Sequence, residues 1–124
     1  MPEEYTALVT AMKALTKPPI TTSEAAVTLP VAEDEWRTRP NADSWGIISL
    51  DFEVSALTGD DRKVAEAYEG SVDLYSYKRD GEGWPAEIRR TLTEHCGSCW
   101  GLSYHGQESE SKLFHWEWYF QVEG

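Results

Sequence analysis

Hydrophobic and polar residues alternate most strictly in the segment from Lys112 to Glu123. Five large apolar residues occupy every second position there: Phe114, Trp116, Trp118, Phe120 and Val122. The positions between them are mostly polar: Leu113, His115, Glu117, Tyr119 and Gln121. Successive side chains of a strand point to opposite faces, so this pattern predicts a strand with one apolar face. Burial of a large apolar side chain contributes roughly 1.5–3 kcal/mol. We therefore expect this strand to lie inside a sheet, with a helix covering its aromatic face.

Two earlier segments show the same alternation over 45–54 and 68–78. The apolar positions of the first are Ile48, Leu50, Phe52 and Val54, and its polar positions are Ser49, Asp51 and Glu53. In the second segment, one face of the expected strand carries Tyr68, Gly70, Val72 and Leu74, and the other carries Ser71, Asp73, Tyr75 and Tyr77. One dry face and one wet face are typical of a sheet that helices cover on one side. Shorter strands are expected over 26–31, where Pro30 favours an edge, and over 100–105.

Two segments have the spacing of amphipathic helices. In residues 2–17 the apolar stripe consists of Tyr5, Leu8, Val9, Met12 and Leu15. In residues 84–96 apolar residues recur every four positions: Trp84, Ile88, Leu92 and Cys96. Pro85 suits the first turn of the second helix, and Gly97 suits a left-handed stop after it.

Residues 55–67 are polar and lack either period. We expect a long, mobile connection there, because loops longer than about 12 residues are usually functional or disordered. The element order α-β-β-β-α-β-β predicts a single α+β domain over 1–124. Its one mostly antiparallel sheet has about five strands and is covered by two helices.

The charge is strongly one-sided, with 22 acidic against 11 basic residues and a net charge of −11. This disfavours nucleic acid and anionic membranes as binding partners. The simplest interpretation of the negative charge is that it keeps the protein soluble. A more specific interpretation is a surface that repels DNA or binds a basic partner. No apolar run approaches the roughly 18 residues of a membrane span. The acidic start Met1-Pro2-Glu3-Glu4 does not resemble a secretory signal, so we expect a protein of the cytoplasm.

The best candidate for chemistry is Cys96-Gly97-Ser98-Cys99, which follows His95. It lies at the end of the expected helix, whereas a redox pair sits at a helix start. His105 and His115 could also act as zinc ligands, but their spacing from the cysteines does not match that of a known zinc module. We interpret the cysteines as small residues at a turn, with a metal site or a disulfide as the alternatives. Asp60 and Asp61 lack the further ligands of a calcium loop. We expect no catalytic, cofactor-binding or metal-binding residues.

Several segments together resemble a known family. They are Trp36-x-x-x-Pro40, Ile47 to Leu50, Thr58-Gly59-Asp60-Asp61, Gly70-x-Val72-Asp73-Leu74-Tyr75, Ile88 to Leu92, and His115-Trp116-Glu117-Trp118-x-Phe120-x-Val122-Glu123. Their order is similar to that of the tail-terminator, or tail-completion, proteins of long-tailed bacteriophages, which include minor tail components of prophages. The resemblance covers about residues 33–124.

The resemblance implies a structural protein without enzymatic activity or cofactor. Such subunits assemble into a hexameric ring that caps the tail tube, ends its polymerisation and provides the head–tail joining surface. Its partners would be copies of itself, the tube protein and the head–tail connector protein. It would reside in the virion tail, and in the host cytoplasm during assembly. The loop over 55–67 would face the tube with Thr58, Gly59, Asp60, Asp61, Arg62 and Lys63.

DNA would pass through such a ring without specific binding. An acidic lumen repels phosphate, so the genome could slide. Candidate lumen acids on the wet strand faces are Asp51, Glu53 and Asp73, and Asp60 and Asp61 join them from the loop.

Two other functions stay open at this point. The first is a small acidic binding module, such as a toxin-immunity protein that neutralises a basic nuclease. The second is an enzyme or metal protein that uses Cys96, Cys99 and the histidines, which would contain stoichiometric zinc.

Overall fold

The computed structural model describes residues 3–17, 27–57 and 63–123. For 52–57, 63–66 and 123 it describes the backbone and not the side chains. The elements in chain order are α1 (Glu3–Lys13), β1 (Thr16–Lys17), β2 (Val27–Thr28), β3 (Val31–Glu33), β4 (Ser44–Leu57), β5 (Lys63–Ser76), the 3₁₀ turn η1 (Gly81–Gly83), α2 (Trp84–Cys96), β6 (Trp100–Gln107) and β7 (Phe114–Glu123). Neither α1 nor α2 is long and apolar enough to cross a membrane.

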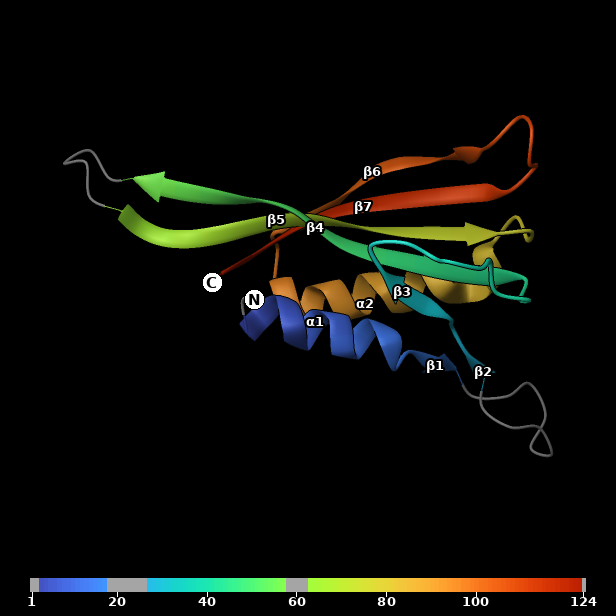
Figure 1. Cartoon of the computed structure of the whole chain (residues 1–124), viewed down its shortest axis with the longest axis horizontal. Helices are drawn as coiled ribbons and strands as arrows, with labels where there is room; N and C mark the ends of the chain where they lie inside the picture. Colours follow the sequence, from blue (N-terminus) through green and yellow to red (C-terminus); the bar gives the residue numbers. More distant parts are fainter. Residues whose placement is uncertain (1–2, 18–26, 58–62, 124) are drawn as a thin grey trace.

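Five strands form one sheet in the order β3-β4-β5-β7-β6. Every neighbouring pair is antiparallel except β3 and β4, which are parallel. Both helices lie on the same side of this sheet, and β1 and β2 form a separate small ribbon (Figure 1). The predicted α+β fold class is therefore confirmed. The aromatic strand β7 lies inside the sheet, between β5 and β6, as its pattern predicted.

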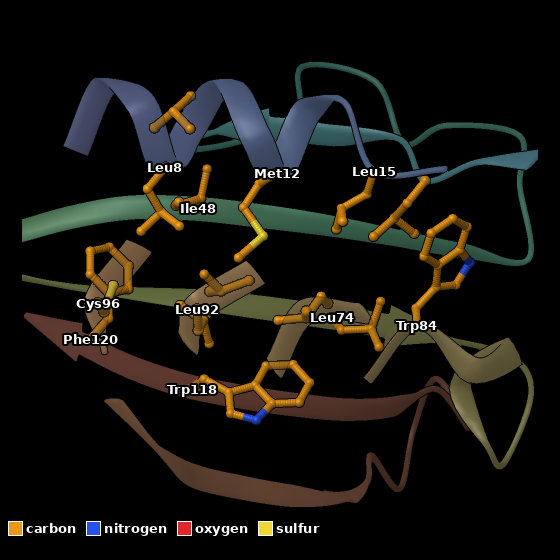
Figure 2. Close-up of a cluster of buried hydrophobic side chains, with 14 of the residues drawn as sticks. Leu8, Met12, Leu15, Ile48, Leu74, Trp84, Leu92, Cys96, Trp118 and Phe120 are labelled. Carbon is orange, nitrogen blue, oxygen red and sulfur yellow. The ribbon is translucent and has the colours of Figure 1, made fainter. Parts of the chain in front are cut away.

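The core lies between the sheet and the two helices (Figure 2). The sheet contributes Ile48, Val72, Leu74, Trp116, Trp118, Phe120 and Val122, all buried. The helices contribute Tyr5, Leu8, Val9, Met12, Trp84, Ile88, Leu92 and Cys96. These are the apolar stripes that the helical and strand periods predicted. Their burial is the main favourable term that holds helices and sheet together.

Gly70 allows the closest approach between the central strands. A Cβ atom at this position would lie 2.3 Å from the carbonyl oxygen of Ser49 and 2.5 Å from Cζ of Phe120. Gly70 pairs with Leu50 on one side and with Phe120 on the other. The ring of Phe120 thus occupies the space that a side chain would need, which lets the core close over β5.

The expectation of a structureless connection over 55–67 was wrong for its two ends, 55–57 and 63–67. β4 continues to Leu57 and β5 begins at Lys63, with pairs such as Ser55 to Glu66 and Ala56 to Ala65. The hairpin extends past the ends of both helices (Figure 1). Backbone pairing forms this part without a helix to cover it, so no apolar alternation marks it in the sequence. The expected mobility of the tip concerns residues 58–62, which lie outside the described residues.

A bulge interrupts the strand pairing within the segment 45–54, where the sequence predicted an unbroken alternation. Leu50 pairs with Gly70 and Phe52 pairs with Glu69, so Asp51 is an extra residue in β4. Such a bulge shifts the alternation by one position and cannot be recognised from a pattern of polar and apolar residues alone.

Helix and strand ends differ slightly from the expected ones. The first helix ends at Lys13 and not at residue 17, where the short strand β1 has already begun. The strand expected over 26–31 is divided into β2 and β3 by Leu29 and Pro30. The two parts pair with different partners, β2 with β1 and β3 with β4, and the chain changes partner at Leu29 and Pro30.

Candidate functional site on the open face of the sheet

One face of the sheet carries the alternate residues of the central strands and no helix. These residues, here called the open face, are Trp45, Ile47, Ser49, Ser71, Asp73, Tyr75, His115, Glu117 and Tyr119. The strand register places Asp73 opposite Glu117 and Tyr75 opposite His115. Neighbours β5 and β7 thereby bring together side chains that are about forty positions apart in the sequence.

A histidine–carboxylate cluster, defined as Asp73, His115 and Glu117, lies in the middle of the open face. Nε2 of His115 is 2.7 Å from Oδ1 of Asp73. One potential ligand atom from each of the three residues lies within 4.8 Å of the other two. The cluster is partly shielded, since the side chains of His115 and Asp73 are only 15% and 16% exposed.

Further polar groups orient the members of the cluster. Oε1 of Glu108 lies 3.7 Å from Nδ1 of His115. The hydroxyl of Ser103 donates to Oε1 of Glu117 at 2.9 Å. Both nitrogens of the imidazole therefore face carboxylates, and Glu117 has a donor that holds its orientation.

Two tyrosines pack against the imidazole of His115. The ring of Tyr75 stacks at a centroid distance of 4.3 Å and an angle of 11°. The ring of Tyr104 lies at 5.2 Å, tilted by 52°. Gly106, which pairs with His115, leaves room for this ring, because a Cβ there would lie 2.5 Å from Oη of Tyr104. His115 is thus held in place by stacking as well as by hydrogen bonding.

The electrostatic potential around the cluster is negative. The pKa of Tyr75 is raised to about 12 by burial, and then by the carboxylates of Asp73, Glu108 and Glu117. Within the described residues, neither Asp73 nor Glu117 forms an ion pair with a lysine or arginine. The site is therefore suited to a cation.

A pocket of about 410 Å³ opens beside the cluster, at the end of the sheet where β4 begins. Its lining residues are Glu35, Trp36, Arg39, Trp45, Ile47, Tyr75, Glu108 and Leu113. Nε1 of Trp36 donates to the carbonyl oxygen of Gly46 at 3.0 Å, and the guanidinium of Arg39 lies 4.6 Å from the ring of Trp45. Leu113 is buried here, although the alternation placed it on the mostly polar face of the last strand.

Strand β6 forms an edge of the sheet and carries no Asp, Glu, Lys or Arg along its eight residues. Three large side chains on or beside it are well exposed: Leu102 at 53%, Tyr104 at 45% and Tyr119 at 46%. Natural edge strands are usually protected by charges, proline, shortness or β-bulges. Of these, β6 has a bulge between Leu102 and Tyr104. The opposite edge strand, β3, is only three residues long.

The predicted lumen acids do not form one group. Asp73 belongs to the histidine–carboxylate cluster. Asp51 is exposed and lies near Tyr5, whose pKa is raised by burial and by the carboxylates of Glu33, Asp34 and Asp51. The side chain of Glu53 and the loop residues Thr58, Gly59, Asp60, Asp61 and Arg62 lie outside the described part, and Lys63 is the first residue of β5.

The two cysteines are free thiols at the end of α2, Cys96 buried and Cys99 exposed. Burial, with smaller contributions from Cys99 and Glu4, raises the pKa of Cys96 to about 12. Among the described residues, the three-residue group with potential metal ligands in reach of one another contains neither cysteine. The chain turns between the end of α2 at Cys96 and the start of β6 at Trp100, which is where the sequence placed the two cysteines.

Sequence reasoning missed His115, Glu117, Glu108 and Ser103 as members of one site. The alternation of the last strand already placed His115 and Glu117 on one face, but it did not mark them as a site. Their position beside Asp73 depends on the register of β5 against β7, which no local pattern reveals.

Comparison of the chain with models of known protein families and with curated proteins found no match.

Proposed function

We propose that this chain is a structural subunit of the tail-terminator type. Copies of the chain would form a ring, which the resemblance implies to be a hexamer. The ring would cap the tail tube of a long-tailed bacteriophage and end its polymerisation. It would also provide the surface for the head–tail connector protein. The proposal combines the resemblance over residues 33–124 with a surface that is suited to self-association. It requires no catalytic group and no cofactor.

The observation that carries the proposal is the uncharged edge of β6. A chain with a net charge of −11 repels its own copies wherever acidic surfaces meet. Strand β6 offers backbone donors and acceptors on an uncharged strand, beside the exposed side chains of Leu102, Tyr104 and Tyr119. Strand addition at such an edge gives affinity through main-chain hydrogen bonds. If β6 of one copy meets a different surface of the next, the contact is heterologous, and its repetition closes a ring when the rotation between neighbours divides a full turn.

The β4–β5 hairpin supports the same proposal. Its two strands are 14 residues each, and it extends beyond the helices (Figure 1). A projection of this kind can reach the tube protein while the sheet edge contacts the neighbouring subunit. The passage of DNA along Asp51, Glu53, Asp60, Asp61 and Asp73 stays a prediction. Reversal of the charges of Asp60 and Asp61 should slow DNA ejection or weaken assembly; an infective titre equal to that of the wild type would count against it.

The first experiment measures mass in solution across protein concentrations, with and without the tube protein. We expect concentration-dependent association, and a shift of its midpoint by at least tenfold in Leu102→Glu, because a buried carboxylate disfavours the new strand pair. Ala86→Glu is the matched control: residue 86 is exposed on α2, away from the edge of β6, and association should persist. A chain that stays monomeric even with the tube protein, but binds a basic nuclease tightly, would instead indicate the toxin-immunity module.

The second experiment is electron microscopy of phage tails assembled without this protein. We expect overlong tubes without heads, since nothing would end polymerisation. Tails of normal length joined to heads would refute the proposed role.

A further inference from the structure

We propose that the histidine–carboxylate cluster is a binding site for one divalent transition-metal ion, with Zn²⁺ as the best fit. The ligands would be Nε2 of His115 and one carboxylate oxygen each from Asp73 and Glu117. Ligands at about 2.0–2.2 Å around a tetrahedral zinc ion are roughly 3.4 Å apart. Atoms that already lie within 4.8 Å of one another can reach this arrangement by side-chain rotation alone.

The neighbours of the three residues are those that a metal site requires. Metal-binding histidines usually donate their other ring N–H to a carboxylate, which fixes the ring and raises its basicity. Glu108 lies on this side of the ring, 3.7 Å from Nδ1 of His115, which is an ion-pair distance and slightly longer than a hydrogen bond. The hydroxyl of Ser103 donates a hydrogen bond to Glu117 and so orients a second ligand, the Glu117 carboxylate.

The charge arrangement on the open face is a second, independent observation. Asp73 and Glu117 are directly opposite each other on β5 and β7, and like charges in this position destabilise a sheet. Glu108 adds a third carboxylate near the same imidazole. A single histidine can balance one of these charges at most, and within the described residues no lysine or arginine pairs with Asp73 or Glu117. A divalent cation would offset the remainder.

The nature of the ligands selects the class of ion. An imidazole nitrogen with carboxylate oxygens suits Zn²⁺, whereas Mg²⁺ prefers oxygen ligands and retains its water. Zinc binds the neutral imidazole through the lone pair of Nε2, so the single ring proton would lie on Nδ1, on the side of Glu108. The fourth position faces the solvent side of the open face and would hold water.

The test is isothermal titration calorimetry, in which ZnSO₄ is added to the full chain at neutral pH. The chain carries Cys99→Ser, so that the exposed thiol does not compete for zinc. We expect one equivalent of zinc. Asp73→Asn and His115→Gln should each weaken binding by at least 100-fold, and Glu108→Gln by roughly 10–100-fold. His95→Gln, which changes a histidine of α2 outside the cluster, is the matched control and should bind as the parent does.

X-ray absorption of the zinc-loaded wild type supplies a measurement that does not depend on the variants folding. We expect one nitrogen ligand and several oxygen ligands without sulfur. Absence of zinc binding, unchanged binding in Asp73→Asn and His115→Gln, or sulfur ligands would each overturn the site. None of these results depends on ring formation, so the metal site and the proposed function fail or stand separately.

Discussion

Substitution of Gly70 by alanine tests how closely the core packs around β5. The added Cβ would lie 2.3 Å from the carbonyl oxygen of Ser49, 2.5 Å from Cζ and 3.0 Å from Cε1 of Phe120. Non-bonded carbon atoms are ordinarily 3.5–4.0 Å apart, so the ring has to retreat by about 1 Å. The Ser49 carbonyl belongs to the paired backbone of β4 and β5 and cannot move without disturbing that pairing.

Forced insertion of a methyl group into a packed core costs typically 1–3 kcal/mol, occasionally more. Two close contacts, one of them to backbone, place this substitution at the upper end, about 3 kcal/mol. For a chain of 124 residues this corresponds to a fall of roughly 10 °C in Tm. Part of the cost is steric overlap with Phe120, so Gly70→Ala and Phe120→Leu should be coupled in a double-mutant cycle by about 1 kcal/mol.

The assay is urea unfolding followed by far-UV circular dichroism, together with a thermal scan. Gly46→Ala is the matched control, because a Cβ at this buried glycine meets the Asp73 carbonyl oxygen and Val31 at 3.4 Å, an ordinary contact. It should be neutral or stabilising by up to about 1 kcal/mol, since alanine restricts the unfolded chain. Equal stabilities of Gly70→Ala and the wild type would refute the packing described here.

Two further predictions concern ionisable groups. The native pKa of Tyr75, about 12, lies above the ordinary value of 10.0, so the native state keeps a proton that the unfolded state loses. The stability due to this group is complete below pH 10 and is lost as the pH rises from 10 to 12, by up to roughly 2–3 kcal/mol. Tyr75→Phe should therefore lose less stability than the wild type between pH 9 and 11.5 in urea unfolding; parallel curves would contradict this. Cys99 is exposed and Cys96 is buried with a pKa of about 12, so a thiol reagent should modify one thiol in the native protein and two after unfolding. Rapid native labelling in Cys99→Ser would show that the reasoning about Cys96 is wrong.

Local signals predicted much of the fold. The second helix spans Trp84–Cys96 as expected, and Pro85 lies in its first turn. Gly97 ends it with a positive φ of 60°, but its ψ of −118° lies outside the left-handed helical region that was expected. The apolar face of β7 was recognised from alternation alone, and its residues Trp116, Trp118, Phe120 and Val122 are buried. In each case the residues that specify the element are neighbours in the chain or one helical turn apart.

The candidate site could be predicted only in part. Asp73 was recognised as a polar residue of a strand, but Asp51, which had been grouped with it, is the extra residue of a bulge in β4 and does not belong to the cluster. The length of the β4–β5 hairpin was missed because backbone hydrogen bonds between strands do not require apolar residues.

Periodicity, capping residues and composition act through contacts between near neighbours, so they define which helices and strands form and which of their faces are apolar. The meeting of Asp73, His115, Glu117 and Glu108 depends instead on how β5, β7 and the turn before β7 pair with one another. A shift of one residue in that pairing would move His115 and Glu117 to the other face of the sheet. Strand register is set by the packing of the whole core, and for this reason the cluster exists only in the folded protein.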